Sequence, residues 1–195
     1  MPHLPRGSSS RFGSRSKAHA KTGGQLPYLR NGWDGGEKYY QRKSDRCAER
    51  GSGIFIDGKI VLGHDGFAGE LGHTIIRPGG RLHKGTGIRG TLESYASATG
   101  VRETALEMLE QHPNTKSALR LIPVEELTSE KVFDCAIKGD KIALEIFQFT
   151  GQILGEALAN FIMFSSPEAI VLFGGLTKAG DLILNPTQAA MEANL

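Results

Sequence analysis

GSGIFIDGKIVLG, residues 51–63, is the stretch that decides the fold class. Two short runs of β-branched and aromatic residues flank Asp57-Gly58, a pair typical of a type I′ turn because glycine takes positive φ at no steric cost. The stretch therefore predicts a β-hairpin. HTIIRPGG (73–80) predicts a further strand ended by Pro78. EAIVLFGG (168–175) is a short apolar run closed by a glycine pair, and it predicts a buried strand that leads into a turn.

Helical patterns separate these strands. Residues 93–111 are mostly helical in pattern, with an interruption near Thr99-Gly100. Ser129 suits the N-cap of a short helix that runs through Ile137, and Gly139 follows its end. Hairpin, strand, helices, strand and helix in this order predict an α/β fold with a mixed sheet.

The longest helix is predicted from Asp140, as its N-cap, to about Phe164. Its apolar positions recur at helical spacing and cover most of one side, which indicates that it packs on other elements. Asn185-Pro186 predicts the start of a last helix, with proline at the first helical position. That pattern stops at Leu195 without a visible C-cap, so we expect a truncated lobe.

Charge divides the chain into two parts. Residues 1–50 carry 11 Lys and Arg against 4 Asp and Glu, whereas residues 51–195 carry 12 against 17, within a total of +2. The first part is rich in Ser, Gly and basic residues and poor in aliphatic ones, so it is predicted to be disordered and separate from a domain at 51–195. A nucleic-acid-binding arm is the functional alternative to a solvated tail, and the solvated tail is favoured.

Composition indicates an ordinary soluble protein, with 39% hydrophobic and 23% charged residues. No apolar run reaches the roughly 18 residues of a membrane span, and no signal-peptide pattern opens the chain. Cys47 and Cys135 have no metal or redox spacing. A lone disulfide stays possible, but two reduced thiols in a cytoplasmic protein are favoured.

The densest polar constellation comprises Glu70, His73 and Glu93, in GFAGELGHT (66–74) and TLESYASATG (91–100). Carboxylates accept hydrogen bonds from sugar hydroxyls, and a neutral histidine adds a donor or an acceptor. The glycines around them allow a close approach of the backbone. These residues suit a polyol site, although such a group is also common on ordinary surfaces.

From Gly51 to the end, the chain resembles the ROK family of glucokinase-like sugar kinases. The resemblance is carried by AGELGH (68–73), by LESYASATG (92–100) at the family's spacing, and by FGGLTKAGDLI (173–183). It implies part of an actin-like, ribonuclease-H-like kinase lobe. The reaction implied is ATP-dependent phosphorylation of glucose to glucose 6-phosphate, with Mg²⁺ and a possible homodimer.

The resemblance also implies residue roles. Glu70 and His73 would bind sugar hydroxyls, and Glu93 would bind near the anomeric end. Gly51, Ser52 and Gly53 would end a phosphate-binding loop, and Gly174 and Gly175 would line the adenosine side, although tight turns explain these glycines equally well.

The chain departs from the family in three respects. The family's zinc cluster uses the histidine that corresponds to His73 together with three cysteines. The cysteine positions hold Lys84 or His83, Thr86 and Thr91, so we expect no structural zinc. No N-D-[AVN] motif supplies a catalytic aspartate, so no catalytic residue is assigned. Finally, AERGSGIF (48–55) enters the resemblance within a motif, which suggests a frameshift or misplaced start upstream.

The sequence thus leaves several readings. The chain is expected to be related to sugar kinases but inactive alone. A sugar-sensing ROK-type regulator is the alternative, disfavoured because residues 1–50 show no helix-turn-helix pattern. A basic nucleic-acid-binding product and a non-functional truncated gene product are the remaining readings.

Overall fold

The computed structural model describes residues 29–31 and 52–195. Except for residues 29–31, the predicted disordered basic segment lies outside the described residues. The predictions for Cys47 and Gly51 also lie outside them. The described helices are α2 (Ala98–Gln111), α3 (Ser129–Ala136), α4 (Lys141–Ser165) and α5 (Asp181–Ala193). The strands are β1 (Leu29–Asn31), β2 (Phe55–Ile56), β3 (Lys59–Ile60) and β4 (Ile170–Leu172). Short 3₁₀ turns connect them: η1 (Leu71–His73), η2 (Leu92–Ser94), η3 (Ala118–Leu121), η4 (Val124–Glu126) and η5 (Gly175–Ala179).

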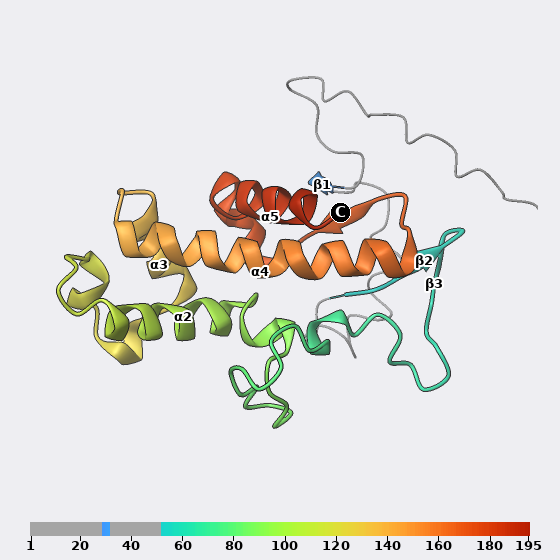
Figure 1. Cartoon of the computed structure of the whole chain (residues 1–195), viewed down its shortest axis with the longest axis horizontal. Coiled ribbons are helices and arrows are strands. Elements are labelled where there is room, and N and C mark those ends of the chain that lie inside the picture. Colours follow the sequence, from blue (N-terminus) through green and yellow to red (C-terminus); the bar gives the residue numbers. More distant parts are fainter. Residues whose placement is uncertain (1–28, 32–51) are drawn as a thin grey trace, which may run out of the picture.

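The predicted hairpin is confirmed. β2 pairs antiparallel with β3, with Phe55 opposite Ile60 and Ile56 opposite Lys59. Asp57 (φ 49°) and Gly58 (φ 73°) both lie in the left-handed region, as a type I′ turn requires. The hairpin lies toward the C-terminal end of α4 (Figure 1).

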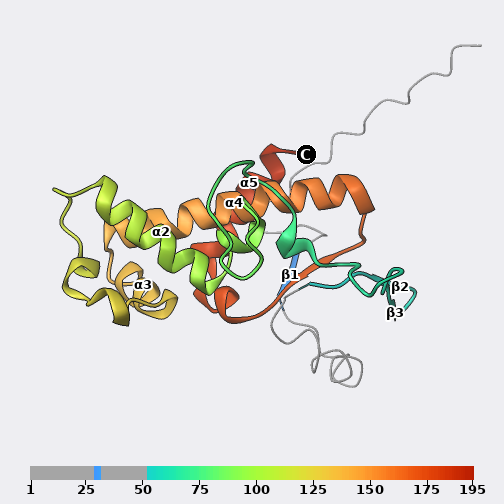
Figure 2. The same cartoon turned by 90° about the horizontal axis from the view of Figure 1, so that it is seen from below.

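The predicted strand in EAIVLFGG is also present, as β4. It pairs in parallel with β1, a short strand that the sequence did not predict (Figure 2). Val171 is 38% exposed, whereas a fully buried strand was expected. Within the described residues β4 has a strand on one side only. Ile170 and Leu172 are half-buried against the core cluster of Leu158, Ala159 and Met191, so Val171 is the exposed residue of the strand. The parallel and antiparallel pairs form separate two-stranded sheets there.

α4 is the axis of the molecule, with α5 and α2 along its length and α3 near its N-terminal end (Figure 1). The predicted N-cap is confirmed, because the Asp140 side chain accepts a hydrogen bond from the Ala143 N–H at 3.0 Å. The core forms where the apolar faces of the four helices meet. Its most deeply buried members include Val101, Leu119, Val132, Ile142, Ile146, Phe147 and Ile183.

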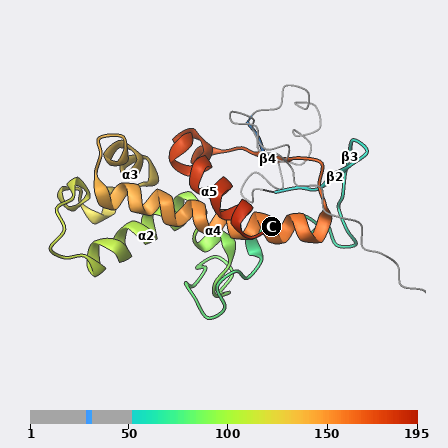
Figure 3. The same ribbon diagram turned by 45° about the horizontal axis from the view of Figure 1, so that its top comes forward.

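α4 and α5 pack closely because two glycines face α5. A Cβ on Gly151 would lie 2.5 Å from Cγ of Pro186, and one on Gly155 would lie 2.7 Å from Cβ of Ala190. α5 begins at Asp181, after Gly180, so Pro186 lies inside the helix and the predicted start at Asn185-Pro186 is wrong. This proline is buried against Gly151 of α4. It has no backbone N–H, so α5 lacks one helical hydrogen bond there. Figure 3 shows β4 in the connection that leads from α4 to α5.

Three helix ends differ from the prediction. α2 is continuous through Thr99-Gly100, and the interruption comes earlier, where Ser97 caps the helix by accepting from the Gly100 N–H. The N-cap of α3 is Thr128, and Ser129 is its first residue. α5 does have a C-cap, because the Asn194 side-chain amide donates to the Ala190 carbonyl at 2.7 Å.

HTIIRPGG does not form a strand. It contributes only an isolated antiparallel bridge between Ile75 and Thr91, followed by a second between Leu82 and Arg89. We call residues 74–91 the site loop. Gly90 is required at its neck, because φ is +78° there and a Cβ would overlap the Arg77 carbonyl. The loop thus leaves and rejoins the same place, between η1 and η2.

Among the helices that the structure describes, none combines the length and the apolarity that crossing a bilayer requires.

Candidate functional site

η1 carries Glu70 and His73. Ser52 holds this turn, because its hydroxyl donates to the Gly69 carbonyl and accepts from the Leu71 N–H at 3.0 Å. Gly69 (φ 87°) brings the two backbones together, and a Cβ there would lie 3.0 Å from Gly53 Cα. Ser52, predicted to approach nucleotide phosphates, therefore supports the turn that presents Glu70.

η2 carries Glu93. The Thr91 hydroxyl caps this turn and lies 2.8 Å from the Ser94 hydroxyl. Leu92 and Tyr95 are buried against Ile153 and Ala157 of α4, so η2 is fixed on the long helix. The Leu92 N–H donates to the Thr74 carbonyl at 2.9 Å and joins η2 to the end of η1. Two turns that are separated by the site loop thus become neighbours.

The structure brings together all three residues predicted to bind sugar. His73 Nδ1 lies 3.7 Å from Glu93 Oε2, and His73 Nε2 lies 4.0 Å from Glu70 Oε2. Both distances exceed those of hydrogen bonds. Among the described residues, neither ring nitrogen of His73 has a hydrogen-bond partner, although both atoms are buried. Buried polar atoms are normally paired, so this cluster suits a hydroxyl-rich ligand that would complete it.

His83 is a fourth member of the cluster. Its Nε2 lies 3.7 Å from Glu93 Oε2, its ring meets the His73 ring edge-on at 5.6 Å between centroids, and its Nδ1 lies 2.8 Å from Thr86 Oγ1. The sequence indicated His83 only as a replacement for a cysteine. The pairing of Leu82 with Arg89, which turns the loop tip back toward η2, is a contact that local sequence does not reveal.

The residues at the family's cysteine positions are poor ligands for a structural zinc ion. Within the described residues, no three His, Cys, Asp or Glu side chains are grouped to hold a metal. The residues at the cysteine positions have other partners. Lys84 Nζ lies 3.3 Å from Glu103 Oε1, the Thr86 hydroxyl contacts His83, and the Thr91 hydroxyl caps η2. The expectation of no structural zinc stays a prediction.

The residues predicted on the nucleotide side lie in two places. Ser52 and Gly53 lie beside η1, whereas Gly174 and Gly175 follow β4 at the start of η5. Gly174 has φ of +105°, so the turn itself requires glycine there. A Cβ on either glycine would meet nothing within 4 Å, so packing does not require glycine at these positions. Their role in nucleotide binding stays a prediction.

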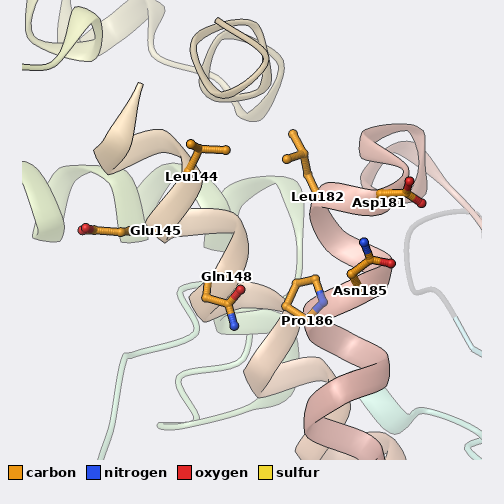
Figure 4. A pocket seen from close by; sticks show the side chains of 7 residues that line it. All are labelled: Leu144, Glu145, Gln148, Asp181, Leu182, Asn185 and Pro186. Carbon is orange, nitrogen blue, oxygen red and sulfur yellow. The ribbon is translucent and has the colours of Figure 1, made fainter. Parts of the chain in front are cut away.

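A separate hollow of about 380 Å³ lies between α4 and α5 (Figure 4). It contains none of the predicted site residues, and its outward-facing acids and amides are not grouped around a common point (Figure 4). The cluster of Glu70, His73 and Glu93 is therefore the better candidate site. The residues that line the hollow are Leu144, Glu145, Gln148, Asp181, Leu182, Asn185 and Pro186.

Comparison with known proteins gives relatives of two kinds. A glucokinase of Halalkalibacterium halodurans is 38% identical over 143 residues, which cover 73% of this chain and 43% of that enzyme. The DNA-binding transcriptional dual regulator NagC of Escherichia coli is 32% identical, over 73% of this chain and 34% of that protein.

Among solved structures, a ROK family glucokinase from Streptomyces griseus, in complex with glucose and AMPPNP, matches with a TM-score of 0.65 and 30% identity. The match covers 73% of this chain and 46% of that enzyme. The chain therefore spans less than half the length of these relatives, and it has the fold of part of a ROK sugar kinase. The family model described as ROK family matches residues 50–195, and the chain belongs to the ROK family.

Proposed function

We propose that this chain is the sugar-binding part of a ROK-type sugar kinase whose reaction is ATP-dependent phosphorylation of glucose. The observation that carries the proposal is the half-buried His73 side chain between Glu70 and Glu93, whose two buried ring nitrogens have no hydrogen bond to a described residue. The similarity to glucokinases supports glucose as the sugar and ATP with Mg²⁺ as the phosphoryl donor. It also supports a cytoplasmic location.

Each site residue has a chemical task in this proposal. Glu70 and Glu93 accept hydrogen bonds from sugar hydroxyls, and such bonds to a charged acceptor are about twice as strong as neutral ones. One ring nitrogen of His73 donates and the other accepts, which suits a hydroxyl that does both. Gly174 and Gly175 would line the adenosine side, with open space where a Cβ would stand.

Glucose titration followed by isothermal calorimetry tests the sugar site. We expect saturable binding that Glu93→Gln and Glu70→Gln each weaken by roughly tenfold or more, because a charge-assisted hydrogen bond is replaced by a neutral one. Glu192→Gln is the matched control, since Glu192 is exposed on α5 and bonds only Gln188 among the described residues. Equal affinities of all three variants and the wild type would contradict the proposal.

A sugar-responsive regulator is the second candidate, favoured by the 32% identity to NagC. Nucleotide binding separates the two. The kinase proposal expects Mg²⁺-ATP to bind and Gly175→Val to reduce that binding, whereas a regulator that only senses sugar is expected to bind glucose or a related sugar without ATP. Fluorescent ATP analogues measure this directly.

Turnover by the chain alone is a different question. No carboxylate among the described residues is assigned as the base that phosphoryl transfer requires. We therefore expect no glucose 6-phosphate above background in a coupled assay with Mg²⁺-ATP. Turnover above background would mean that a carboxylate of this chain acts as the base.

A further inference from the structure

Arg81 makes five side-chain hydrogen bonds to described residues beside the candidate site. Its Nε and Nη2 donate to the two oxygens of Glu107 at 2.9 and 2.7 Å. Nη2 also donates to Thr104 Oγ1 at 3.0 Å, and Nη1 donates to the carbonyls of Ser94 and Gly100 at 2.6 and 3.0 Å. All five N–H donors of the guanidinium are therefore used. The side chain is only 10% exposed although it is charged.

Tyr95 closes the arrangement from the other side. The Arg81 guanidinium lies over the Tyr95 ring, 4.6 Å from its centroid. The backbone N–H of Arg81 donates to the Tyr95 hydroxyl at 2.8 Å. Gly80 is needed beside it, because a Cβ there would overlap that hydroxyl. We call Arg81, Tyr95 and Glu107 the arginine clasp.

The clasp joins three segments that are distant in sequence. Arg81 belongs to the site loop, Tyr95 follows η2, and Glu107 lies in α2. The Ser94 carbonyl that Arg81 binds comes directly after Glu93, so the bond fixes the turn that presents this carboxylate. A second arginine of the loop, Arg77, pairs with Glu156 of α4 at the neck. The loop is thus tied to both long helices through its own side chains.

These contacts of Arg77 and Arg81 can hold the site loop in place of a structural zinc ion, for which the residues at the cysteine positions are poor ligands. We propose that Arg81 is the positioning residue of the sugar site, and that the arginine clasp fixes Glu93 against His73 without any metal ion. The proposal rests on the proposed function for the sugar itself, but the state of the loop can be measured without sugar.

Hydrogen–deuterium exchange of the whole chain, with and without a metal chelator, tests the clasp. We expect exchange in residues 74–96 to be unchanged by the chelator. We expect Arg81→Lys to accelerate it at least about tenfold while exchange in α5 stays unchanged, because lysine retains the charge but cannot replace the planar five-donor fork. Arg89→Lys is the control from the same loop, since Arg89 is exposed and its side chain makes one hydrogen bond among the described residues, to the Gly80 carbonyl.

Glucose affinity provides the second readout. We expect Arg81→Ala to raise the glucose Kd by about tenfold or more, and added guanidinium ion to restore part of the affinity, which a general loss of folding would not allow. If wild-type chain binds no glucose, the proposed function fails, and the exchange data still decide the clasp. Faster loop exchange on chelation, or wild-type exchange in Arg81→Lys, would overturn it.

Discussion

Asp140 joins three parts of the chain through one carboxylate. One oxygen accepts from the Ala143 N–H and the Ser117 hydroxyl, each at 3.0 Å, and the other accepts from the Ala118 N–H at 2.6 Å. We predict that Asp140→Ala lowers the free energy of unfolding by about 2 kcal/mol, because it removes the cap of α4 and leaves two further donors unpaired. Urea denaturation measures this. Asp134→Ala, at an exposed position of α3, should change stability by less than about 0.5 kcal/mol.

Cys135 couples the stability of the core to pH. Burial raises the pKa of this thiol above its usual 9.0, and the carboxylates of Asp140 and Asp134 act in the same direction while Lys138 opposes them. The unfolded thiol ionises first as pH rises, so the folded state loses stability above about pH 9 and keeps this contribution below it. We predict a smaller loss in Cys135→Ala between about pH 8 and pH 10, measured by urea denaturation. Identical losses would contradict this assignment.

Some residues of the candidate site could be predicted from the sequence and others could not. Glu70, His73 and Glu93 were predicted as one site because their residue types and motif spacing are informative, and the structure places them together. Arg81 was not predicted. Its five bonds reach η2 and α2, and an arginine in a glycine-rich loop has no local pattern that distinguishes it from a solvated one.

At the scale of elements, the contact between α4 and α5 depends on missing side chains. A Cβ on Gly155 would lie 2.8 Å from the Met191 nitrogen, which is backbone and cannot move away alone. We predict that Gly155→Ala lowers the free energy of unfolding by about 1–3 kcal/mol through overpacking. Gly175→Ala is the matched control, because its Cβ would enter open space and its φ is not in the left-handed region. Equal stability of the two variants would contradict close helix packing.

Element boundaries were harder to predict than the elements themselves. The Asp57-Gly58 hairpin and the Asp140 cap rest on local chemistry, and both are confirmed. The start of α5 was placed at Pro186 because proline is usual at a first helical position, but packing against Gly151 keeps this proline inside the helix. HTIIRPGG has the composition of a strand, yet two bridges across the loop take the place of a ladder.

At the scale of the whole molecule, apolar side chains remain uncovered on the part that the structure describes. Met163 is 73% exposed and Phe164 is 89% exposed, and they are consecutive residues in the last turn of α4. Adjacent exposed apolar groups favour association. We predict that the average mass of the chain rises with concentration in sedimentation equilibrium, and that Met163→Gln with Phe164→Gln reduces this rise.

Leu121→Gln is the control for association. Leu121 is 86% exposed but lies in η3, near the opposite end of α4, without an equally exposed apolar neighbour in sequence. The rise in mass should persist in this variant. Equal association of the double variant and the wild type would locate the contact elsewhere on the molecule.

Histidine side-chain NMR during a glucose titration tests the central claim most directly, because the ring of His73 reports the site itself. The ring nitrogens are assigned with His73→Gln and His83→Gln variants. We predict saturable shifts of the His73 nitrogens, smaller shifts at His83, and none at exposed His64, with loss of the effect in Glu93→Gln. A titration in which the His73 nitrogens do not move, while the chain remains folded, would contradict a sugar site between Glu70, His73 and Glu93.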